Sequence, residues 1–200
     1  DFQPGVRVLL ERNPNYWQDG LPYLDAVELR IITDESVRRS ALVSGDVDWA
    51  ISVPPQSLEE LRARDDLVVD AVPAGAYWYI GVNTTVEPLN DVRVRQAIAY
   101  AINREQIAEV ATFGTAVATQ GPIPASSSWA VEYSPYEQNL DRARELLAEA
   151  GVADGFSMRI MPTTQYEESI RIAQMLQAQL SPLNITTNIR TLEWAEWLQE

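Results

Sequence analysis

The sequence predicts an α/β protein with mixed sheets, in which a β-rich first part is followed by an α/β second part. Short runs that alternate apolar and polar residues recur up to residue 83, and such alternation is typical of half-buried strands. Between residues 156 and 193 the pattern changes to strand, helix, strand, which favours a right-handed βαβ unit with parallel pairing. With 200 residues, 46% of them hydrophobic, the chain is long and apolar enough to build a core.

Two alternating runs near the start predict a pair of strands, at residues 5–12 and 26–32. Their apolar side chains, each set on one face, are Val6, Val8 and Leu10 in the first run and Val27, Leu29 and Ile31 in the second. Residues 13–25 between them are rich in turn formers and aromatic residues, which indicates a loop. We therefore expect the two runs to pair.

The segment after these strands carries two helix-capping signals. Asp34 precedes a helical run that Gly45 ends, so we expect a capped helix between them. Ser57 and Glu60 have the spacing of a capping box, which predicts a second helix. Three further short strands are predicted at residues 46–55, 67–72 and 77–83.

The second part begins with a helix over residues 92–102. Its apolar stripe at helical spacing consists of Val94, Ala97, Ile98, Ala101 and Ile102. Asn90 or Asp91 can cap this helix, because a short side-chain oxygen accepts from a free N–H of the first turn. Asn103 can cap a second helix directly after it, with Gln106 in the position that returns the hydrogen bond in a capping box.

Two arginines, Arg93 and Arg95, lie in the first turn of this helix. Side chains two residues apart point to different parts of a helix surface, so the pair is not expected to clamp one anion. We interpret both as structural residues.

The rest of the second part predicts one more helix and then the βαβ unit. Gly151 ends an apolar helical run that starts near residue 140. Residues 156–162 and 184–193 alternate as strands. The helix between the two strands is marked by Ile172, Leu176 and Leu180.

Composition excludes several classes of function. The net charge of −14 disfavours nucleic acid and anionic membrane surfaces as partners, since both attract basic patches. The sequence has no histidine, cysteine or lysine, so the usual zinc ligands, general bases and thiol nucleophiles are missing. Asp46 and Asp48 lack the downstream ligands of a calcium loop. We therefore expect no catalytic residues, no metal site and no cofactor.

An aromatic run, Tyr77, Trp78 and Tyr79, is the main candidate for a binding surface. In an extended segment, Tyr77 and Tyr79 share one face and Trp78 takes the other. Such residues often serve core or interface packing. They also suit the wall of a cleft for a small amphipathic ligand, and both readings stay open here.

Five segments together carry a resemblance to a known family. They are ERNPNYWQDGLPYLDAVELRIITD, ALVSGDVDWAISVPP, YIGVNTTVEPLNDVRVRQAIAYAINREQI, ARELLAEAGVADGF and LSPLNITTNIRTLEW. In this order they resemble the peptide, dipeptide and nickel solute-binding proteins of ABC importers. The resemblance covers nearly all 200 residues, and because members of that family are more than twice as long, it implies an internal fragment.

The resemblance implies a type II periplasmic-binding-protein-like fold with two lobes. We expect residues 1–82 to be the β-rich part of the first lobe, residues 83–90 the crossing between lobes and residues 91–200 the α/β part of the second. The cleft-lining positions that it implies are Ile51, Ser52 and Val53 in one segment and Ala74, Tyr77, Trp78 and Tyr79 in the other.

The function implied is that of a receptor that captures a peptide or similar small solute and hands it to an ABC permease. The intact protein is then expected in the periplasm or outside the cell, associated with the membrane. Two alternatives remain open: a peptide hydrolase that uses carboxylates, and a protein–protein interaction module. Apolar surfaces left uncovered in a fragment also lead us to expect self-association.

Overall fold

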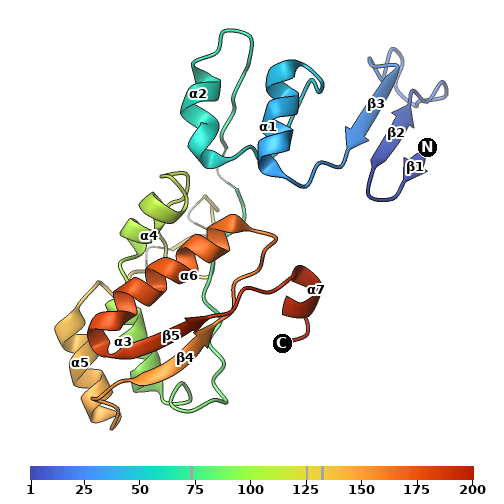
Figure 1. Cartoon of the computed structure of the whole chain (residues 1–200). Helices are drawn as coiled ribbons and strands as arrows, with labels where there is room; N and C mark the ends of the chain where they lie inside the picture. The colour runs from blue at the N-terminus through green and yellow to red at the C-terminus, as the bar shows by residue number, and fades with distance from the viewer. Residues whose placement is uncertain (73, 125, 132) are drawn as a thin grey trace. The chain divides into compact units, whose positions relative to one another are not determined.

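The computed structural model describes residues 1–72, 74–124, 126–131 and 133–200 (Figure 1). It divides into two compact units, Asp1–Val69 and Asp70–Glu200, which are described separately below. The crossing predicted at residues 83–90 lies inside the second unit. The predicted lobe boundaries stay predictions, because the units describe the contacts of this chain and not the lobes of a longer receptor.

The first unit contains an antiparallel sheet in the order β1-β2-β3. Its strands are β1 (Phe2–Gln3), β2 (Arg7–Glu11) and β3 (Ala26–Arg30). The predicted pairing is confirmed, and its register sets Val8 opposite Leu29 and Leu10 opposite Val27. Residues directly opposite one another share a face of a sheet. The predicted apolar side chains of these strands therefore form one surface, but Leu10 and Leu29 on it are exposed.

Helix α1 (Glu35–Ser44) has the predicted caps. The Asp34 carboxylate accepts from the backbone N–H of Val37 at 2.9 Å, and Gly45 ends the helix in the left-handed conformation. Helix α2 (Leu58–Arg62) is also present, but the predicted capping box is wrong. Ser57 is the last residue of the 3-10 turn η1 (Pro55–Ser57), so its backbone is already helical and its side chain makes no capping bond.

The strands predicted at residues 46–55, 67–72 and 77–83 are wrong. Among the described residues, none of the three segments belongs to a strand. In 46–55 the chain bends, and Ser52 has a φ of 58°, which breaks an extended run. The other two segments have no neighbouring strand in the described chain, and a β-strand forms only where a hydrogen-bonded neighbour exists.

In the second unit, β4 (Phe156–Ile160) and β5 (Ile185–Ile189) pair in parallel, as predicted. They are joined by α6 (Glu167–Leu180) and the short 3-10 helix η2 (Ser181–Leu183). A glycine is required just before β4. Gly155 has a φ of +84°, and a Cβ atom there would lie 2.1 Å from the carbonyl oxygen of Asn184.

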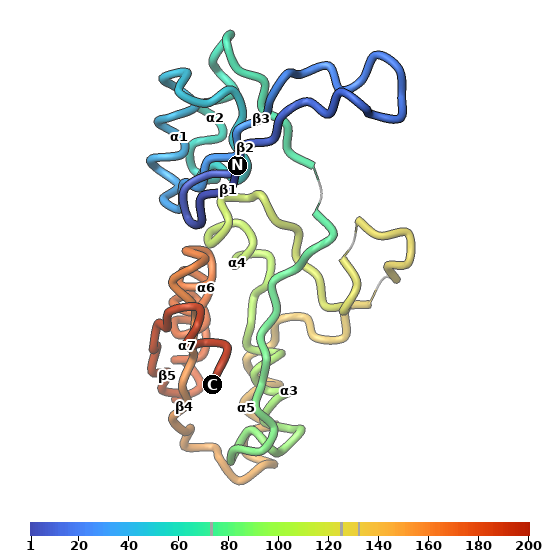
Figure 2. The backbone as a smooth tube through the Cα atoms, turned by 90° about the vertical axis from the view of Figure 1, so that its right-hand side faces the viewer, coloured from blue at the N-terminus to red at the C-terminus, as the bar shows by residue number. Residues whose placement is uncertain are grey.

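The other helices in the described part of this unit are α3 (Val92–Ala101), α4 (Arg104–Ala111), α5 (Leu140–Glu149) and α7 (Trp194–Trp197). Figure 2 shows β4, β5 and α6 on one side and α3 and α5 on the other. The core lies between them and includes the whole predicted stripe of α3. Its buried members are Val94, Ala97, Ile98, Ala101, Ile102, Ala143, Leu146, Leu147, Leu176, Leu180, Leu183 and Ile185.

Of the two hydrogen bonds predicted for the capping box of α4, one is confirmed and the other is wrong. The Asn103 side chain accepts from the backbone N–H of Gln106 at 2.8 Å, as predicted. The backbone N–H of Asn103 donates to the side-chain oxygen of Gln179 in α6, at 2.9 Å, and not to Gln106. The Gln106 side chain instead accepts from Gln179 at 2.9 Å. A partner from another helix thus replaces the local one.

Arg93 and Arg95 are structural residues, as predicted. Arg93 forms an ion pair with Asp91 at 2.6 Å and donates to the carbonyl oxygen of Glu149 at 2.5 Å, which ties α3 to the end of α5. Arg95 donates to the carbonyl oxygens of Leu89 and Asn90 at 2.8 and 2.9 Å. The two guanidinium groups have different partners and do not form one clamp.

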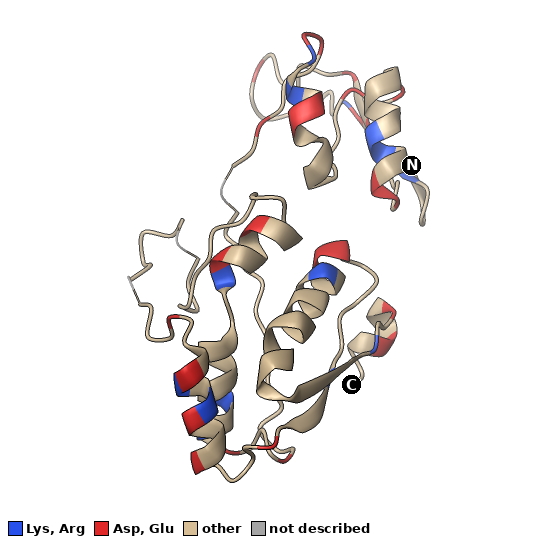
Figure 3. Cartoon of the chain, turned by 60° about the vertical axis from the view of Figure 1, so that its left-hand side comes forward, with Lys and Arg blue, Asp and Glu red and all other residues tan. Residues whose placement is uncertain are grey.

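Charged side chains in the second unit are most frequent on α5 and also lie on α4, α7 and the start of α6, whereas the rest of α6 and both strands are largely uncharged (Figure 3). On α5, Arg142 pairs with Glu145 and Glu149, and Arg144 pairs with Asp141. None of the helices in the described part of the chain is both long and apolar enough to cross a membrane.

Candidate ligand-binding site

The first predicted site segment, residues 51–53, lies in a bend of the first unit. Ile51 has 64% of its surface exposed, and Val53 is half-buried. Ser52, between them, has a φ of 58°, in the left-handed region that side chains other than glycine rarely adopt. This segment is therefore an irregular, partly open loop and not the strand end that the sequence predicts.

Arg38 of α1 holds this loop through its backbone. Its guanidinium group donates twice to the Ser52 carbonyl oxygen, from Nη2 at 2.7 Å and from Nε at 3.2 Å. Sequence reasoning does not find this contact, because it joins a helix to a loop 14 residues later and leaves no periodic pattern. The left-handed residue likewise carries no signal, since serine is not a residue that favours that conformation.

The second predicted segment, Ala74 and Tyr77 to Tyr79, lies in the second unit. The Ala74 carbonyl oxygen accepts from the Ser126 hydroxyl group at 3.1 Å. The rings of Tyr77 and Tyr79 lie together, with centroids 6.0 Å apart. Trp78 contacts a different neighbour, Tyr166, edge to face at 5.4 Å. The predicted separation of the tyrosines from Trp78 is thus present although the segment is not a strand.

Trp78 begins a chain of aromatic contacts that we call the aromatic row, formed by Trp78, Tyr166, Trp194 and Trp197. Tyr166 contacts Trp194 edge to face at 6.1 Å, and Trp194 stacks on Trp197 at 5.3 Å with the ring planes 8° apart. The Trp197 indole N–H donates to the Met161 carbonyl oxygen at 2.8 Å. The first three members each keep at least 39% of their surface exposed, so the row is accessible from outside.

Sequence reasoning misses Tyr166, Trp194 and Trp197, although a signal for them exists. Tyr166 follows β4, and Trp194 follows β5. The carboxyl ends of parallel strands meet at one edge of a sheet, and ligands of open α/β sheets bind at that edge. Aromatic residues after two strands of a predicted βαβ unit therefore indicate a joint surface, and the row is the part of this unit that fits a flat or apolar ligand group.

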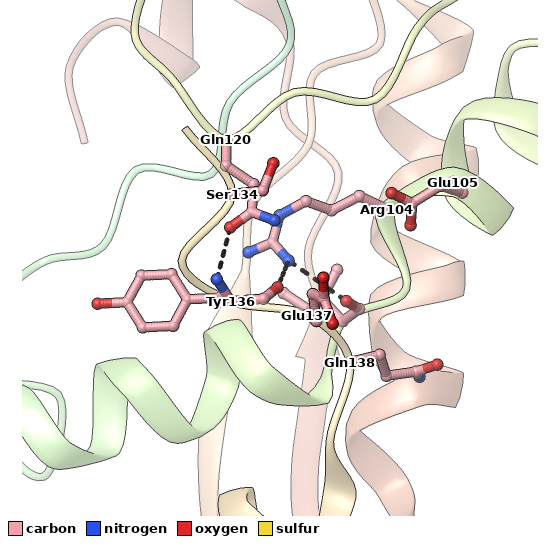
Figure 4. Close-up of a pocket in the computed structure, with 8 residues that line it drawn as sticks. Arg104, Glu105, Gln120, Ser134, Tyr136, Glu137 and Gln138 are labelled. Carbon is pink, nitrogen blue, oxygen red and sulfur yellow. Dashed lines mark hydrogen bonds between the residues drawn. The ribbon is translucent and has the colours of Figure 1, made fainter. Parts of the chain in front are cut away.

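A separate hollow of about 260 Å³ lies beside the start of α4 (Figure 4). Its lining residues are Ile102, Arg104, Glu105, Gln120, Ser134, Tyr136, Glu137 and Gln138. Arg104 donates to the carbonyl oxygens of Ala99, Ile102 and Tyr136 at 3.1 to 3.4 Å. Burial lowers the pKa of Arg104. These contacts give Arg104 a structural role, and the hollow contains none of the predicted site residues.

Within the described residues, no group of three or more acidic side chains is arranged so that it could hold a metal ion. Ser126, in the serine run of the sequence, uses its hydroxyl group to bond the Ala74 carbonyl. The site features are thus exposed aromatic rings and a pinned backbone loop, which suit binding.

Comparison with known proteins gives a match along the entire chain. A family model described as bacterial extracellular solute-binding proteins, family 5 middle, matches residues 1–200. The glutathione-binding protein GsiB of Pectobacterium atrosepticum is 32% identical over 186 residues, which are 93% of this chain and 36% of that protein. The chain therefore spans about a third of the length of this relative.

Two solved structures resemble the chain closely. The ABC transporter-associated periplasmic binding protein DppA from Helicobacter pylori, in complex with the peptide STSA, superposes with a TM-score of 0.84 at 29% identity, over 98% of this chain and 38% of that one. The binding protein AgaA from A. tumefaciens R10, in complex with agropinic acid, gives a TM-score of 0.78 at 29% identity, over 100% of this chain and 41% of that one.

Proposed function

We propose a solute-capturing function for this chain, which belongs to the bacterial extracellular solute-binding proteins of family 5. Its fold is α/β, with one antiparallel and one parallel sheet, of the type II periplasmic-binding-protein kind predicted from the sequence. In our proposal the whole protein is the receptor of an ABC importer. It binds a peptide or a similar small solute and delivers it, unchanged, to a membrane permease.

The observation that carries this proposal is the agreement between the family match and an exposed aromatic surface in the matched region. Relatives that match the chain over most of its length bind different ligands: glutathione for GsiB, a peptide for DppA and agropinic acid for AgaA. Aromatic walls tolerate such variety, because ring contacts depend on shape and apolar area more than on one functional group.

We assign ligand contact to the seven residues predicted from the sequence, Ile51, Ser52, Val53, Ala74, Tyr77, Trp78 and Tyr79, and add Tyr166 and Trp194. All seven predicted residues belong to the predicted first lobe, residues 1–82, and the two added residues belong to the second. In this proposal residues 83–90 cross to the second lobe, residues 91–200. The receptor acts in the periplasm or outside the cell, in association with the membrane that holds its permease.

In this proposal the protein binds its ligand and does not cleave it. A hydrolase that uses carboxylates is the alternative, and the two differ in what happens to the ligand. We expect a receptor of the relatives' full length that carries this chain to release an intact peptide or small solute when it is purified natively and then unfolded. Mass spectrometry of that released molecule, and of a peptide mixture before and after incubation, tests this. Cleavage of the mixture by the purified protein, with no ligand released, would overturn the proposal.

One observation favours a second candidate, a protein–protein contact. The apolar face shared by β2 and β3 is exposed, with Leu10, Val27 and Leu29 at 53%, 39% and 46% exposure. We propose that the 200-residue chain self-associates through this face, since exposed apolar surface and open strand edges recruit partners. Light scattering of the chain and of Leu10→Glu tests this. A strict monomer at all concentrations, before and after the substitution, would exclude it.

A further inference from the structure

The loop at residues 51–53 holds an unfavourable backbone conformation at an exposed position. Ser52 has a φ of 58°, where its Cβ atom crowds the backbone. A serine persists in this region only when its surroundings over-determine it, and such residues cluster at ligand-binding and switch sites. The question is which group in the first unit supplies that restraint.

Arg38 supplies it from the middle of α1. Two of its guanidinium nitrogens converge on the Ser52 carbonyl oxygen, at 2.7 and 3.2 Å. Its third nitrogen, Nη1, donates to the carbonyl oxygens of Ile32 at 2.6 Å and Thr33 at 3.4 Å, just before the helix. The guanidinium group is planar and rigid, so bonds on both of its sides fix its orientation as well as its position.

The restraint acts on the backbone of the predicted site segment and leaves its side chains free. The Ser52 carbonyl group is occupied by Arg38, so a ligand cannot use that oxygen as its acceptor. Ile51 remains largely exposed. The side chain of Arg38 itself is only 20% exposed.

We propose that Arg38 is a positioning residue for ligand capture: it holds Ser52 in the left-handed conformation and so presents residues 51–53 to the ligand. The inference rests on the proposed function, because it gives the loop a part in binding. Arg38 does not touch the ligand. It raises the fraction of molecules whose loop is already in the binding conformation, and apparent affinity scales with that fraction.

The next residue provides a matched control. Arg39 lies on the same helix and is similarly buried, with 26% of its side chain exposed. It forms an ion pair with Glu60 of α2 and, among the described residues, no hydrogen bond or ion pair with residues 51–53. Arg38→Met and Arg39→Met therefore remove the same charge from the same helix, and only the first releases the loop.

The first test measures the loop directly in the 200-residue chain. A residue with positive φ gives a strong nuclear Overhauser effect between its own amide and α protons. We expect this signal at Ser52 in the unsubstituted chain and in Arg39→Met, and its loss in Arg38→Met. If Arg38→Met fails to fold, Arg38→Lys replaces it, because a lysine keeps the charge and the aliphatic stem but lacks the fork. A Ser52 signal that persists in the folded variant would overturn the proposal.

The second test measures function, by calorimetric titration of the full-length receptor with glutathione and with the dipeptide Met-Leu. If the left-handed population falls to about a tenth in Arg38→Met, affinity falls about tenfold, while Arg39→Met stays within about twofold. Equal losses in both variants would show a general structural effect and overturn the positioning role. If the unsubstituted receptor binds neither probe nor any native ligand, the proposed function fails and the positioning role fails with it, whereas the loop result stands by itself.

Discussion

The two compact units differ in how much of their own core they contain. In the second unit, α3, α5, α6 and β5 bury a continuous apolar cluster. In the described part of the first unit, the buried residues are Ala41, Pro54 and Leu61, and the apolar face of its sheet is exposed. A unit that buries little apolar surface gains little from the hydrophobic effect. The second unit therefore gains most of the stabilisation that apolar burial gives this chain.

The two candidate ligand segments differ in the same way. Around the aromatic row, tertiary contacts between rings from three parts of the second unit hold the surface in place. At residues 51–53, one arginine holds the backbone. We infer that the second unit presents a rigid surface, whereas the first presents a loop whose conformation depends on a few polar bonds.

Core truncation gives the largest expected difference between the units. Leu147→Ala removes a side chain that is 2% exposed, and we expect it to lower the free energy of unfolding by about 2–5 kcal/mol. Leu29→Ala, on the exposed sheet face at 46% exposure, should cost less than about 1 kcal/mol. Urea denaturation followed by fluorescence measures both. Equal losses in the free energy of unfolding would mean that the core of the first unit stabilises the chain as much as that of the second.

A smaller loss of stability is expected on substitution of the glycine before β4. Comparing two glycines separates the cost of the backbone conformation from the cost of the steric clash. Gly155 and Gly151 both have positive φ, but a Cβ atom at Gly151 meets open space, whereas one at Gly155 meets the Asn184 carbonyl. Gly151→Ala should cost about 1 kcal/mol for its backbone conformation. Gly155→Ala should cost about 2 kcal/mol more, since the turn must also move. Thermal unfolding of the two variants measures this difference in stability. A difference near zero would show that the backbone between β4 and β5 can move to make room for a Cβ atom at little cost.

The smallest effect concerns the cap of α3 and depends on pH. The hydrogen bonds that Asp91 accepts from the Arg93 side chain and backbone lower the pKa of its carboxyl group from 3.8 to about 2. Because the folded pKa is below the unfolded value, the stabilisation is present above about pH 4 and is lost as pH falls toward 2. Unfolding of Asp91→Asn, measured across this range, should show a weaker acid dependence than the unsubstituted chain. Identical acid dependence of the two chains would show that Asp91 does not contribute to the loss of stability at low pH.

Sequence patterns predict the elements that are determined locally. Asp34, Asp91 and Asn103 cap the helices expected of them. The alternation of residues 156–162 and 184–193, with a helix between them, predicts the parallel pair β4 and β5. Each of these depends on spacing within a few residues. The same local rules fail at Ser57, where two prolines start a 3-10 turn, and in the segments predicted as strands without a neighbour.

Only part of the candidate site can be predicted from sequence patterns. Trp78 stands out in the sequence because it lies in an aromatic run. Its partner Tyr166, and the next ring of the row, Trp194, come from segments about 90 and 115 residues away, so finding them requires the fold. The bond from Arg38 to the Ser52 carbonyl is a side-chain-to-backbone contact, and any residue at position 52 would provide that oxygen. Contacts of this kind leave no trace in residue types.

The central claim, that the aromatic row contacts the ligand, is tested most directly by calorimetric titration of the full-length receptor. The probes are its co-purified ligand, glutathione and Met-Leu, and the variants are Trp78→Ala and Trp17→Ala. Trp17 is 78% exposed in the loop before β3 and belongs to neither candidate segment, so its variant controls for loss of an exposed tryptophan. We predict that Trp78→Ala weakens binding about tenfold and Trp17→Ala leaves it unchanged. Unchanged affinity in Trp78→Ala, with the fold intact, would contradict the account.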